Sequence, residues 1–461
     1  MNNLKNILKT SIPIVVDLGS QIVMWTIETT LVGHIAVNSM RKFYPGLNAT
    51  GVDALTAVGN VVQIVLYTCT VLLIFVFGAT IIVNRLLGER KKAEANHFLG
   101  QSLFTALVPA VLIALIWRFG SPFIFSTVLG ASETVAAIGV DYFRIVSLFA
   151  PFIIMNFVAI GIVRGAGDTH LSMMTALVVN GIHLVLAICL IYGKFFFPEM
   201  GVRGAALAAG IGHTTGFILT FSVILRGRSI LTFQWKDLTA INLRSIREIL
   251  KTGIPITLEQ LAWMTGVTIV IGYSNRLGAV AAAAHIIMLT YQRIFSILYN
   301  AFGMGALTLV GQRFGANAHD EVRQTSKTLF ILAVGVVMIL SSVIFFRSRY
   351  LAMLFTKDRM VIDLCNTVFK IVAFVQIPKA LSFLFSFSLR GVGENRYPMY
   401  LAFIGIFIFE VVLGYTLAFV FSLSIMGLWI AAVCDESFKS LFSARRFIRK
   451  INSIEFDMME D

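Results

Sequence analysis

Charged residues are scarce in this chain. Only 13% of its 461 residues are Asp, Glu, Lys or Arg, whereas roughly 25% is usual in soluble domains. Hydrophobic residues make up 57% of the chain, and the mean hydropathy is +0.85. A water-soluble core could not bury this much apolar surface, so most of the chain must face lipid or other helices. The composition therefore excludes a soluble domain and indicates a membrane protein.

Cysteine is also rare. The four cysteines are scattered singly through apolar stretches, at Cys69, Cys189, Cys365 and Cys434. Their spacing matches neither a metal site nor a disulfide framework. We interpret them as ordinary small apolar residues, and we expect neither a resident metal nor a cofactor.

Apolar runs of about 20 residues, the length that crosses a bilayer as a helix, recur along the chain. They predict about twelve transmembrane helices, near 11–36, 54–84, 94–118, 135–163, 169–195, 203–226, 249–275, 280–310, 325–347, 361–389, 398–422 and 424–444. The runs are too continuously apolar for the strands of a membrane barrel. The first run is too long for a signal peptide and contains Glu28, so we expect it to be a permanent span. The sequence therefore predicts an all-α polytopic membrane protein.

One glycine-containing motif occurs twice, at residues 164–173 (RGAGDTHLSM) and 390–399 (RGVGENRYPM). Two further pairs of short motifs keep about the same separation, 84–88 with 312–315 and 200–206 with 426–432. A repeat of half the chain predicts two parallel six-helix lobes around a central cavity. Neither copy has the lysine or the preceding strand of a phosphate-binding loop. We therefore do not expect transport driven directly by ATP.

The longest polar interruption lies between Arg226 and Lys251 and divides the chain. We predict an N-terminal lobe over 1–228 (helices 1–6), a cytoplasmic linker over 229–248 and a C-terminal lobe over 249–461 (helices 7–12). Basic residues gather in this linker and in the other loops on the side of both termini, which marks the cytoplasmic face. The net charge of +13 therefore reflects topology in the plasma (inner) membrane, and we expect no nucleic-acid partner.

The ordered set of short motifs resembles the multidrug and toxic compound extrusion (MATE) transporters over nearly the whole chain. The similar motifs include Glu28-Thr29 in the first helix, Arg164-Gly165 with Gly167-Asp168-Thr169, Ala283-Ala284-His285, Leu309-Val310-Gly311-Gln312 and Leu389-Arg390-Gly391. The resemblance implies antiport, in which amphipathic, often cationic compounds leave the cell against inward H+ or Na+, without covalent chemistry on the substrate. We expect a monomer whose partners are small organic cations and membrane lipids.

Glu28 is the first candidate for binding the coupling ion. It lies about 22 Å along its helix from Pro13, inside a hydrocarbon core about 30 Å thick. An ionisable side chain there is costly, so it should face a cavity or a partner. Burial favours the neutral form of a carboxyl group and so allows proton uptake. The resemblance gives an acidic residue of the first helix this coupling role, although Asp is commoner at the position. The alternative is a structural glutamate satisfied by a neighbouring helix.

Most other ligands of a first-lobe sodium site are missing. Where similar transporters carry Asn, Asp and Thr, this chain has His183, Ala187 and Ala209, and only Glu28 and Asn180 remain. Hard cations need several oxygen ligands, so H+ is the expected coupling ion and Na+ is the alternative. Because a histidine can relay protons near neutral pH, His183 is either a second proton-binding group or a packing residue.

Five further residues are candidates for the substrate cavity: Gln21, Glu259, Trp263, Lys379 and Arg293. Gln21 shares a helical face with Asp17 and Glu28. Glu259 and Asp17 each lie four residues after a proline, so the two acids are equivalent in the repeat. We expect Glu259 to face the cavity and attract cationic compounds, with Trp263 one turn away and available for stacking. The alternative for Glu259 is an interfacial carboxylate that reaches headgroups or pairs with Arg or Lys. For Asp17 we favour an interfacial carboxylate that either reaches lipid headgroups or pairs with Arg or Lys.

Arg293 and Lys379 place two bases in predicted spans of the second lobe. Buried bases usually pair with acids, and Glu259 or Glu410 are candidate partners. Either base could instead bind an anionic group of a substrate. Lys379 falls near a position where some similar transporters carry an acid, which argues against a second-lobe cation site.

The alternative function is a flippase for lipid-linked oligosaccharides or peptidoglycan precursors, because such proteins share the same broad fold. Arg293 and Lys379 would then meet a pyrophosphate. A membrane receptor or scaffold is disfavoured, because acids inside membrane helices usually serve a functional pathway.

Overall fold

A computed structural model describes residues 2–233 and 242–459 of the chain. Within these ranges every regular element is helical and no strand occurs, which confirms the predicted all-α class. Eleven of the described helices are long and apolar enough to cross a membrane. Residues 234–241 of the predicted linker, with Trp235, lie outside the described residues.

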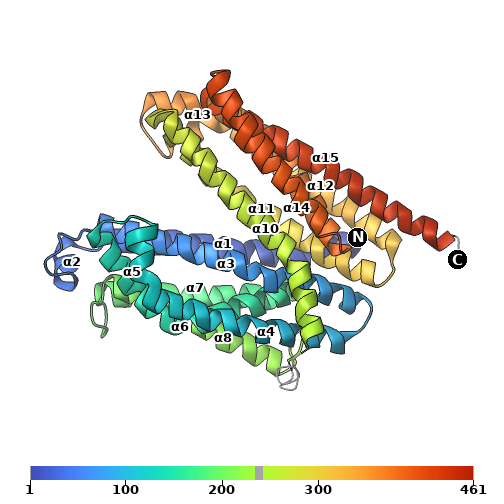
Figure 1. The fold of residues 1–461 in the computed structure, drawn as a ribbon, viewed down its shortest axis with the longest axis horizontal. Helices are drawn as coiled ribbons and strands as arrows, with labels where there is room; N and C mark the ends of the chain where they lie inside the picture. Colours follow the sequence, from blue (N-terminus) through green and yellow to red (C-terminus); the bar gives the residue numbers. More distant parts are fainter. Residues whose placement is uncertain (1, 234–241, 460–461) are drawn as a thin grey trace. The chain divides into compact units, whose positions relative to one another are not determined.

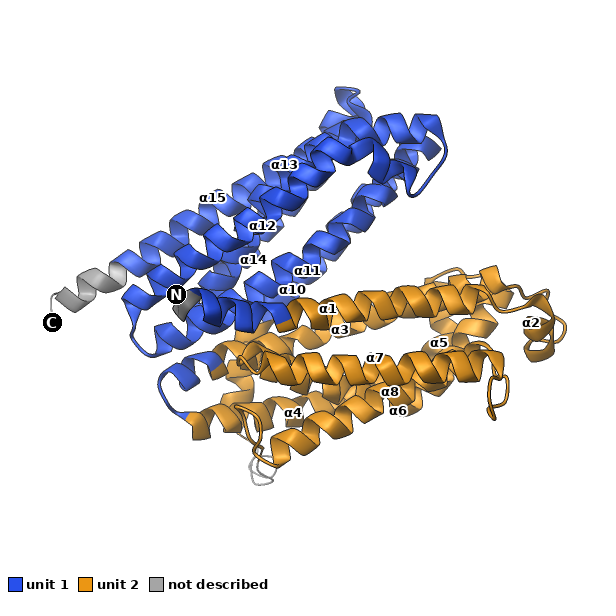
Figure 2. Cartoon of the chain, turned by 180° about the vertical axis from the view of Figure 1, so that it is seen from behind, with its two compact units in different colours: residues 1–12, 84–91, 254–461 blue, residues 13–83, 92–253 orange. Residues whose placement is uncertain are grey.

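The helices form two compact units, coloured separately in Figure 2. Unit 2 comprises Pro13–Val83 and Lys92–Gly253, and unit 1 comprises Met1–Ile12, Asn84–Lys91 and Ile254–Asp461. The predicted lobe limits at residues 228 and 249 stay predictions.

The first half of the chain is labelled α1 to α8 in Figure 1. Its elements are α1 (Asn2–Gly33), α2 (Val37–Phe43), α3 (Gly51–Gly88), α4 (Lys92–Leu115), the π-helix η1 (Ile116–Gly120), α5 (Ser121–Phe123), the π-helix η2 (Ile124–Val128), α6 (Glu133–Gly165), α7 (Thr169–Tyr192) and α8 (Val202–Leu225). In unit 2, α8 packs against both α6 and α7. The core of this unit includes Trp117, whose ring stacks on Phe143 at 5.1 Å between centroids.

The second half of the chain also consists mainly of long helices. Its elements are α10 (Leu243–Arg276), α11 (Ala279–Gly315), α12 (His319–Met353), α13 (Arg359–Gly391), α14 (Arg396–Ile404), the π-helices η3 (Gly405–Leu413) and η4 (Thr416–Val420), and α15 (Ser424–Met459). The predicted span 424–444 forms the first part of α15. It is not among the eleven apolar helices, and it carries Asp435, Glu436 and Lys439.

The repeated glycine motif ends α6 and α13 in the same way. Gly167 has φ +105° and Gly393 has φ +85°, backbone values that residues with a Cβ rarely adopt. After α6, the backbone N–H of Asp168 donates to the carbonyl of Val163 at 3.1 Å, and after α13 Glu394 donates to Leu389 at 2.9 Å. Both are the long bond of a Schellman turn, which satisfies a free carbonyl at a helix end. The motif is thus a repeated helix stop.

We expect Gly167→Ala and Gly393→Ala each to cost about 1–2 kcal/mol, because a Cβ strains a residue held at positive φ. The measurement is the thermal unfolding temperature of the detergent-purified protein. Gly335→Ala is the matched control, since Gly335 lies inside α12 and a Cβ there would meet nothing within 4 Å. Equal unfolding temperatures for all three variants would contradict the assigned role.

Candidate functional site

Glu28 lies near the end of α1 with only 3% of its surface exposed. The hydroxyl of Tyr142, on α6, donates a hydrogen bond to Glu28 Oε1 at 2.9 Å. The Nε2 atom of His183, on α7, lies 3.7 Å from the same oxygen. Both neighbours are themselves buried. Three helices of unit 2 therefore bring a carboxyl, an imidazole and a phenol together away from solvent.

A second histidine belongs to the same surroundings. His213, on α8, interacts electrostatically with both His183 and Glu28. The Nε2 atom of His183 is buried and forms no hydrogen bond with the described residues. A proton on Glu28 or on an imidazole would therefore change the charge balance of this buried group, which suits it to binding and releasing a proton.

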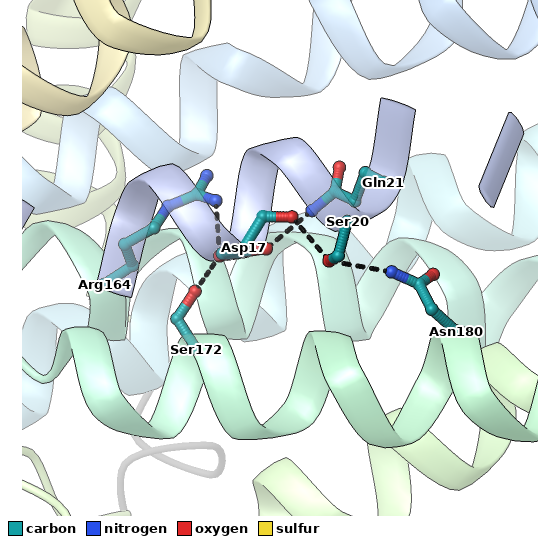
Figure 3. Close-up of polar contacts among 6 residues, drawn as sticks. All are labelled: Asp17, Ser20, Gln21, Arg164, Ser172 and Asn180. Atoms are coloured by element: carbon teal, nitrogen blue, oxygen red, sulfur yellow. Dashed lines mark hydrogen bonds and ion pairs between the residues drawn. The ribbon is translucent and has the colours of Figure 1, made fainter. Parts of the chain in front are cut away.

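Asp17 forms a second buried cluster on α1, drawn in Figure 3. Its carboxylate accepts hydrogen bonds from Arg164 Nη1 at 3.0 Å, from Gln21 Nε2 at 2.8 Å and from the Ser172 hydroxyl. Asn180 donates to the Ser20 hydroxyl at 2.9 Å, and this hydroxyl donates to the Asp17 carbonyl at 2.8 Å. Gln21 and Asn180, which the sequence assigned to a substrate cavity and to a coupling-ion site, thus both join the network around Asp17.

Unit 1 repeats this pairing. Arg390 Nη2 donates to Glu259 Oε1 at 2.6 Å, and the guanidinium lies 4.7 Å from the centre of the Phe387 ring. Arg164 and Arg390 are the arginines of the two repeated motifs, and each lies in the last turn of its helix. A positive side chain at that position also interacts favourably with the negative end of the helix dipole. The arginine of each copy therefore forms an ion pair with an acid that lies four residues after a proline, Asp17 in unit 2 and Glu259 in unit 1.

A third buried cluster lies in unit 1. Lys379, on α13, is 3.6 Å from Glu436 Oε1 on α15. Lys439 lies 2.7 Å from Asp435 Oδ2 and 3.2 Å from Glu436 Oε1. The sequence offered Glu259 and Glu410 as partners for Lys379, but the structure pairs it with Glu436, because α13 and α15 pack together along their length.

The remaining predicted residues are separate from these clusters. Arg293, on α11, has an exposed side chain, and Trp263, on α10, is 40% exposed. Trp263 follows Glu259 by one turn of the same helix. The roles assigned to both residues in substrate binding stay predictions.

Sequence reasoning did not select Tyr142, Asp435, Glu436 or Lys439. Adjacent acids inside a predicted span are a signal that could have identified Asp435 and Glu436, since such acids are rare in membrane helices. Tyr142 offers no comparable signal, because a tyrosine in an apolar run is common and only the packing of α6 against other helices places it beside Glu28.

Known proteins resemble the chain over nearly its full length. The model of the MatE family matches residues 46–189 and 255–416. A probable multidrug resistance protein NorM of Thermotoga maritima is 26% identical over 447 residues, which cover 96% of this chain and 92% of that protein. The multidrug resistance protein MdtK of Edwardsiella ictaluri is 23% identical over 457 residues, which cover 96% of this chain and 94% of that protein.

Solved structures share the fold. A MATE structure described as the bent conformation matches with a TM-score of 0.87 at 18% identity, over 99% of this chain and 97% of its own. A MOP superfamily transporter from Pyrococcus furiosus, described as having a binding pocket of reverse polarity, matches with a TM-score of 0.86 at 18% identity. The match covers 98% of this chain and 97% of that one. These likenesses confirm the predicted MATE-like architecture.

We expect Arg164→Met to destabilise the protein by about 3–5 kcal/mol, because it leaves the buried carboxylate of Asp17 without its positive partner. The double variant Asp17→Asn/Arg164→Met should recover part of this loss. Thermal unfolding in detergent measures both effects.

The control for this prediction is Arg203→Met. Arg203 pairs with Asp141 at 2.7 Å in the same unit, but its side chain is 43% exposed, and such pairs contribute about 0–1 kcal/mol. If the two single variants unfold at the same temperature, the Asp17–Arg164 pair is not a stabilising contact.

Proposed function

Because this chain belongs to the MatE family of membrane transporters, we propose that it is a secondary active antiporter that exports amphipathic organic compounds. Family members are transporters and not enzymes. Two relatives that match most of the chain are named as multidrug resistance proteins, which supports this substrate class. Substrate leaves the cell while a coupling ion enters, by alternating access.

The proposed coupling ion is H+, and the proposed carrier is Glu28. The observation that carries this proposal is a carboxyl group buried to 97% in an apolar helix beside Tyr142 and His183. Na+ binding requires several oxygen ligands, and at positions where similar transporters carry such ligands this chain has His183, Ala187 and Ala209. Proton binding needs no such ligand set.

Binding or release of a proton at Glu28 changes the charge of its carboxyl group, and this change can alter how the surrounding helices pack. An ionised Glu28 carboxylate accepts the hydrogen bond of the Tyr142 hydroxyl and lies beside the His183 ring, whereas a neutral carboxyl group depends less on these two neighbours. The two states therefore favour different packing of α1 against α6 and α7. Substrate that binds one packing better shifts the equilibrium toward it, which links export to proton entry.

We infer that the substrates are organic cations. Glu259, on α10, is contacted by Arg390 through its Oε1 atom at 2.6 Å, but its Oε2 atom has no hydrogen-bond partner among the described residues and is the atom that a cation would meet. The partly exposed ring of Trp263 lies one turn away for stacking against a flat cation. The positive charge of Lys379 would repel a cationic substrate, but Glu436 lies 3.6 Å from its ammonium group and largely compensates this charge. Arg293 stays exposed on α11 and is the base that an anionic substrate group would meet.

The proposed arrangement in the cell follows from the distribution of basic residues. We infer a multi-pass protein of the plasma membrane with both termini in the cytoplasm. Its two lobes span 1–228 and 249–461, and we propose that it acts as a monomer in contact with membrane lipids.

The test is efflux of ethidium from proteoliposomes under an imposed pH gradient or an imposed Na+ gradient. Wild-type protein should drive efflux with the pH gradient, and Glu28→Gln should abolish it, because the amide cannot bind and release a proton. Glu133→Gln is the matched control, since Glu133 is an exposed acid in the first turn of α6. The control should transport like wild type.

Other outcomes discriminate between the alternatives. Efflux driven by Na+ alone would replace H+ with Na+ as the coupling ion. Efflux that persists in Glu28→Gln would remove this residue from the coupling site. Absence of efflux under both gradients, from folded protein, would favour the flippase of lipid-linked oligosaccharides or peptidoglycan precursors.

A further inference from the structure

Four charged side chains meet in the interior of unit 1, and a fifth, the half-buried Glu410, interacts with them electrostatically. Asp435, Glu436 and Lys439 lie on α15, Lys379 on α13 and Glu410 on η3. Glu410 interacts electrostatically with both Asp435 and Lys439. Asp435 lies about 17 Å along α15 from Ser424, so the group sits well inside the helix bundle. None of these residues has a role in the function proposed above beyond the neutralisation of Lys379.

The cluster contains more acids than bases. Its three carboxyl groups, from Glu410, Asp435 and Glu436, face two ammonium groups, from Lys379 and Lys439. If all five were ionised, the cluster would carry one uncompensated negative charge. An isolated buried charge is costly, and a protein normally avoids it by neutralising one group. Uptake of one proton removes the imbalance.

The contacts of the carboxyl oxygens indicate where that proton resides. Glu436 Oε1 lies within 3.6 Å of both lysine nitrogens, and Ser382 also interacts with this carboxylate, so the ionised form of Glu436 is well compensated. Asp435 is completely buried and has a single lysine, Lys439, which it shares. Its Oδ1 atom has no hydrogen-bond partner among the described residues, and the same holds for Glu436 Oε2, so the two acids differ in the number of lysines that contact them. Asp435 is therefore the poorer site for a permanent negative charge.

Among the described residues, the surroundings of Asp435 offer no further base. Its Oδ1 faces the backbone at Gly405, where a Cβ would collide with it. Gly405 begins η3, and π-helical turns are frequent at functional sites. From α11, Tyr299 is the titratable group that interacts electrostatically with Glu436, and its hydroxyl hydrogen-bonds to Gln376. From α13 and η3 the charged neighbours are Lys379 and Glu410.

We propose that this cluster binds one exchangeable proton, with Asp435 as its main carrier, and that it is a second coupling site beside Glu28. The proposal rests on the proton antiport proposed above and extends it to both units. The protonated cluster is neutral, and the deprotonated cluster carries one negative charge between α13, η3 and α15. Gain or loss of the proton therefore changes how these helices pack, as it does around Glu28 in unit 2.

The experiment is infrared difference spectroscopy of the full-length protein in liposomes, acidified from about pH 8 to about pH 5. Uptake of a proton by a buried carboxylate produces the C=O band of a protonated carboxyl group. We expect this band to persist in Glu28→Gln and to be lost in Glu28→Gln/Asp435→Asn. Glu28→Gln/Glu410→Gln should lose it as well, because removal of either acid balances the cluster.

The control is Glu28→Gln/Asp363→Asn. The Asp363 side chain is 65% exposed, in the first turns of α13, so the spectrum should match that of Glu28→Gln. Size-exclusion chromatography of each variant confirms folding, and the Glu410 variant keeps the test valid if Asp435→Asn fails to fold.

Two outcomes would overturn the proposal. Loss of the band already in Glu28→Gln means that the cluster holds no exchangeable proton over this range. Persistence of the band in both double variants means that the proton is bound elsewhere. A band unchanged by Glu28→Gln, together with unchanged ethidium efflux, would reject Glu28 as a coupling residue while leaving the Asp435 site standing, so the two failures are distinguishable.

Discussion

Charges in the interior of this protein have to be compensated by the protein itself, because the lipid around its apolar helices supplies neither water nor counter-ions. The helices meet this requirement through contacts between segments far apart in the chain. Arg164 contacts Asp17 across 147 residues, and Arg390 contacts Glu259 across 131. Removal of one partner would leave a buried charge uncompensated, which costs far more than the net gain from the pair. These contacts therefore constrain which helices pack together.

The same requirement explains why one short motif recurs. Its arginine holds an acid of a proline-containing helix, its first glycine allows close packing, and its second glycine adopts the positive φ that ends the helix. At Gly391 an added Cβ would meet the backbone of α11, and at Gly165 it would meet the Thr80 side chain. One sequence of ten residues thus specifies a helix end, a close approach and an ion pair in each unit.

The proposed coupling sites differ from these fixed pairs in their charge balance. Asp17 and Glu259 each contact an arginine, which stays protonated, so a permanent positive charge faces each of these two carboxyl groups. Glu28 is paired with a histidine, whose own charge depends on pH, and the cluster around Asp435 has one acid more than it has bases. A proton can therefore bind and leave at Glu28 without breaking a permanent ion pair, and at Asp435 while Lys439 keeps its contact with Glu436. This distinction separates groups that stabilise the fold from groups suited to coupling.

The sequence by itself determined the helical membrane architecture, the duplicated motif and the burial of Glu28, because composition and the length of apolar runs report directly on the lipid environment. For Asp17 it left lipid headgroups and a basic residue open as partners, and it could not select Arg164. It offered the wrong partners for Lys379 and passed over Tyr142 and Asp435. Only the tertiary structure decided these contacts, because the partner of a buried side chain depends on how helices distant in the sequence are rotated and packed against one another. The periodicity of a sequence shows which residues share one face of a helix. Which helix packs against that face, and with which side chains, depends on the whole fold.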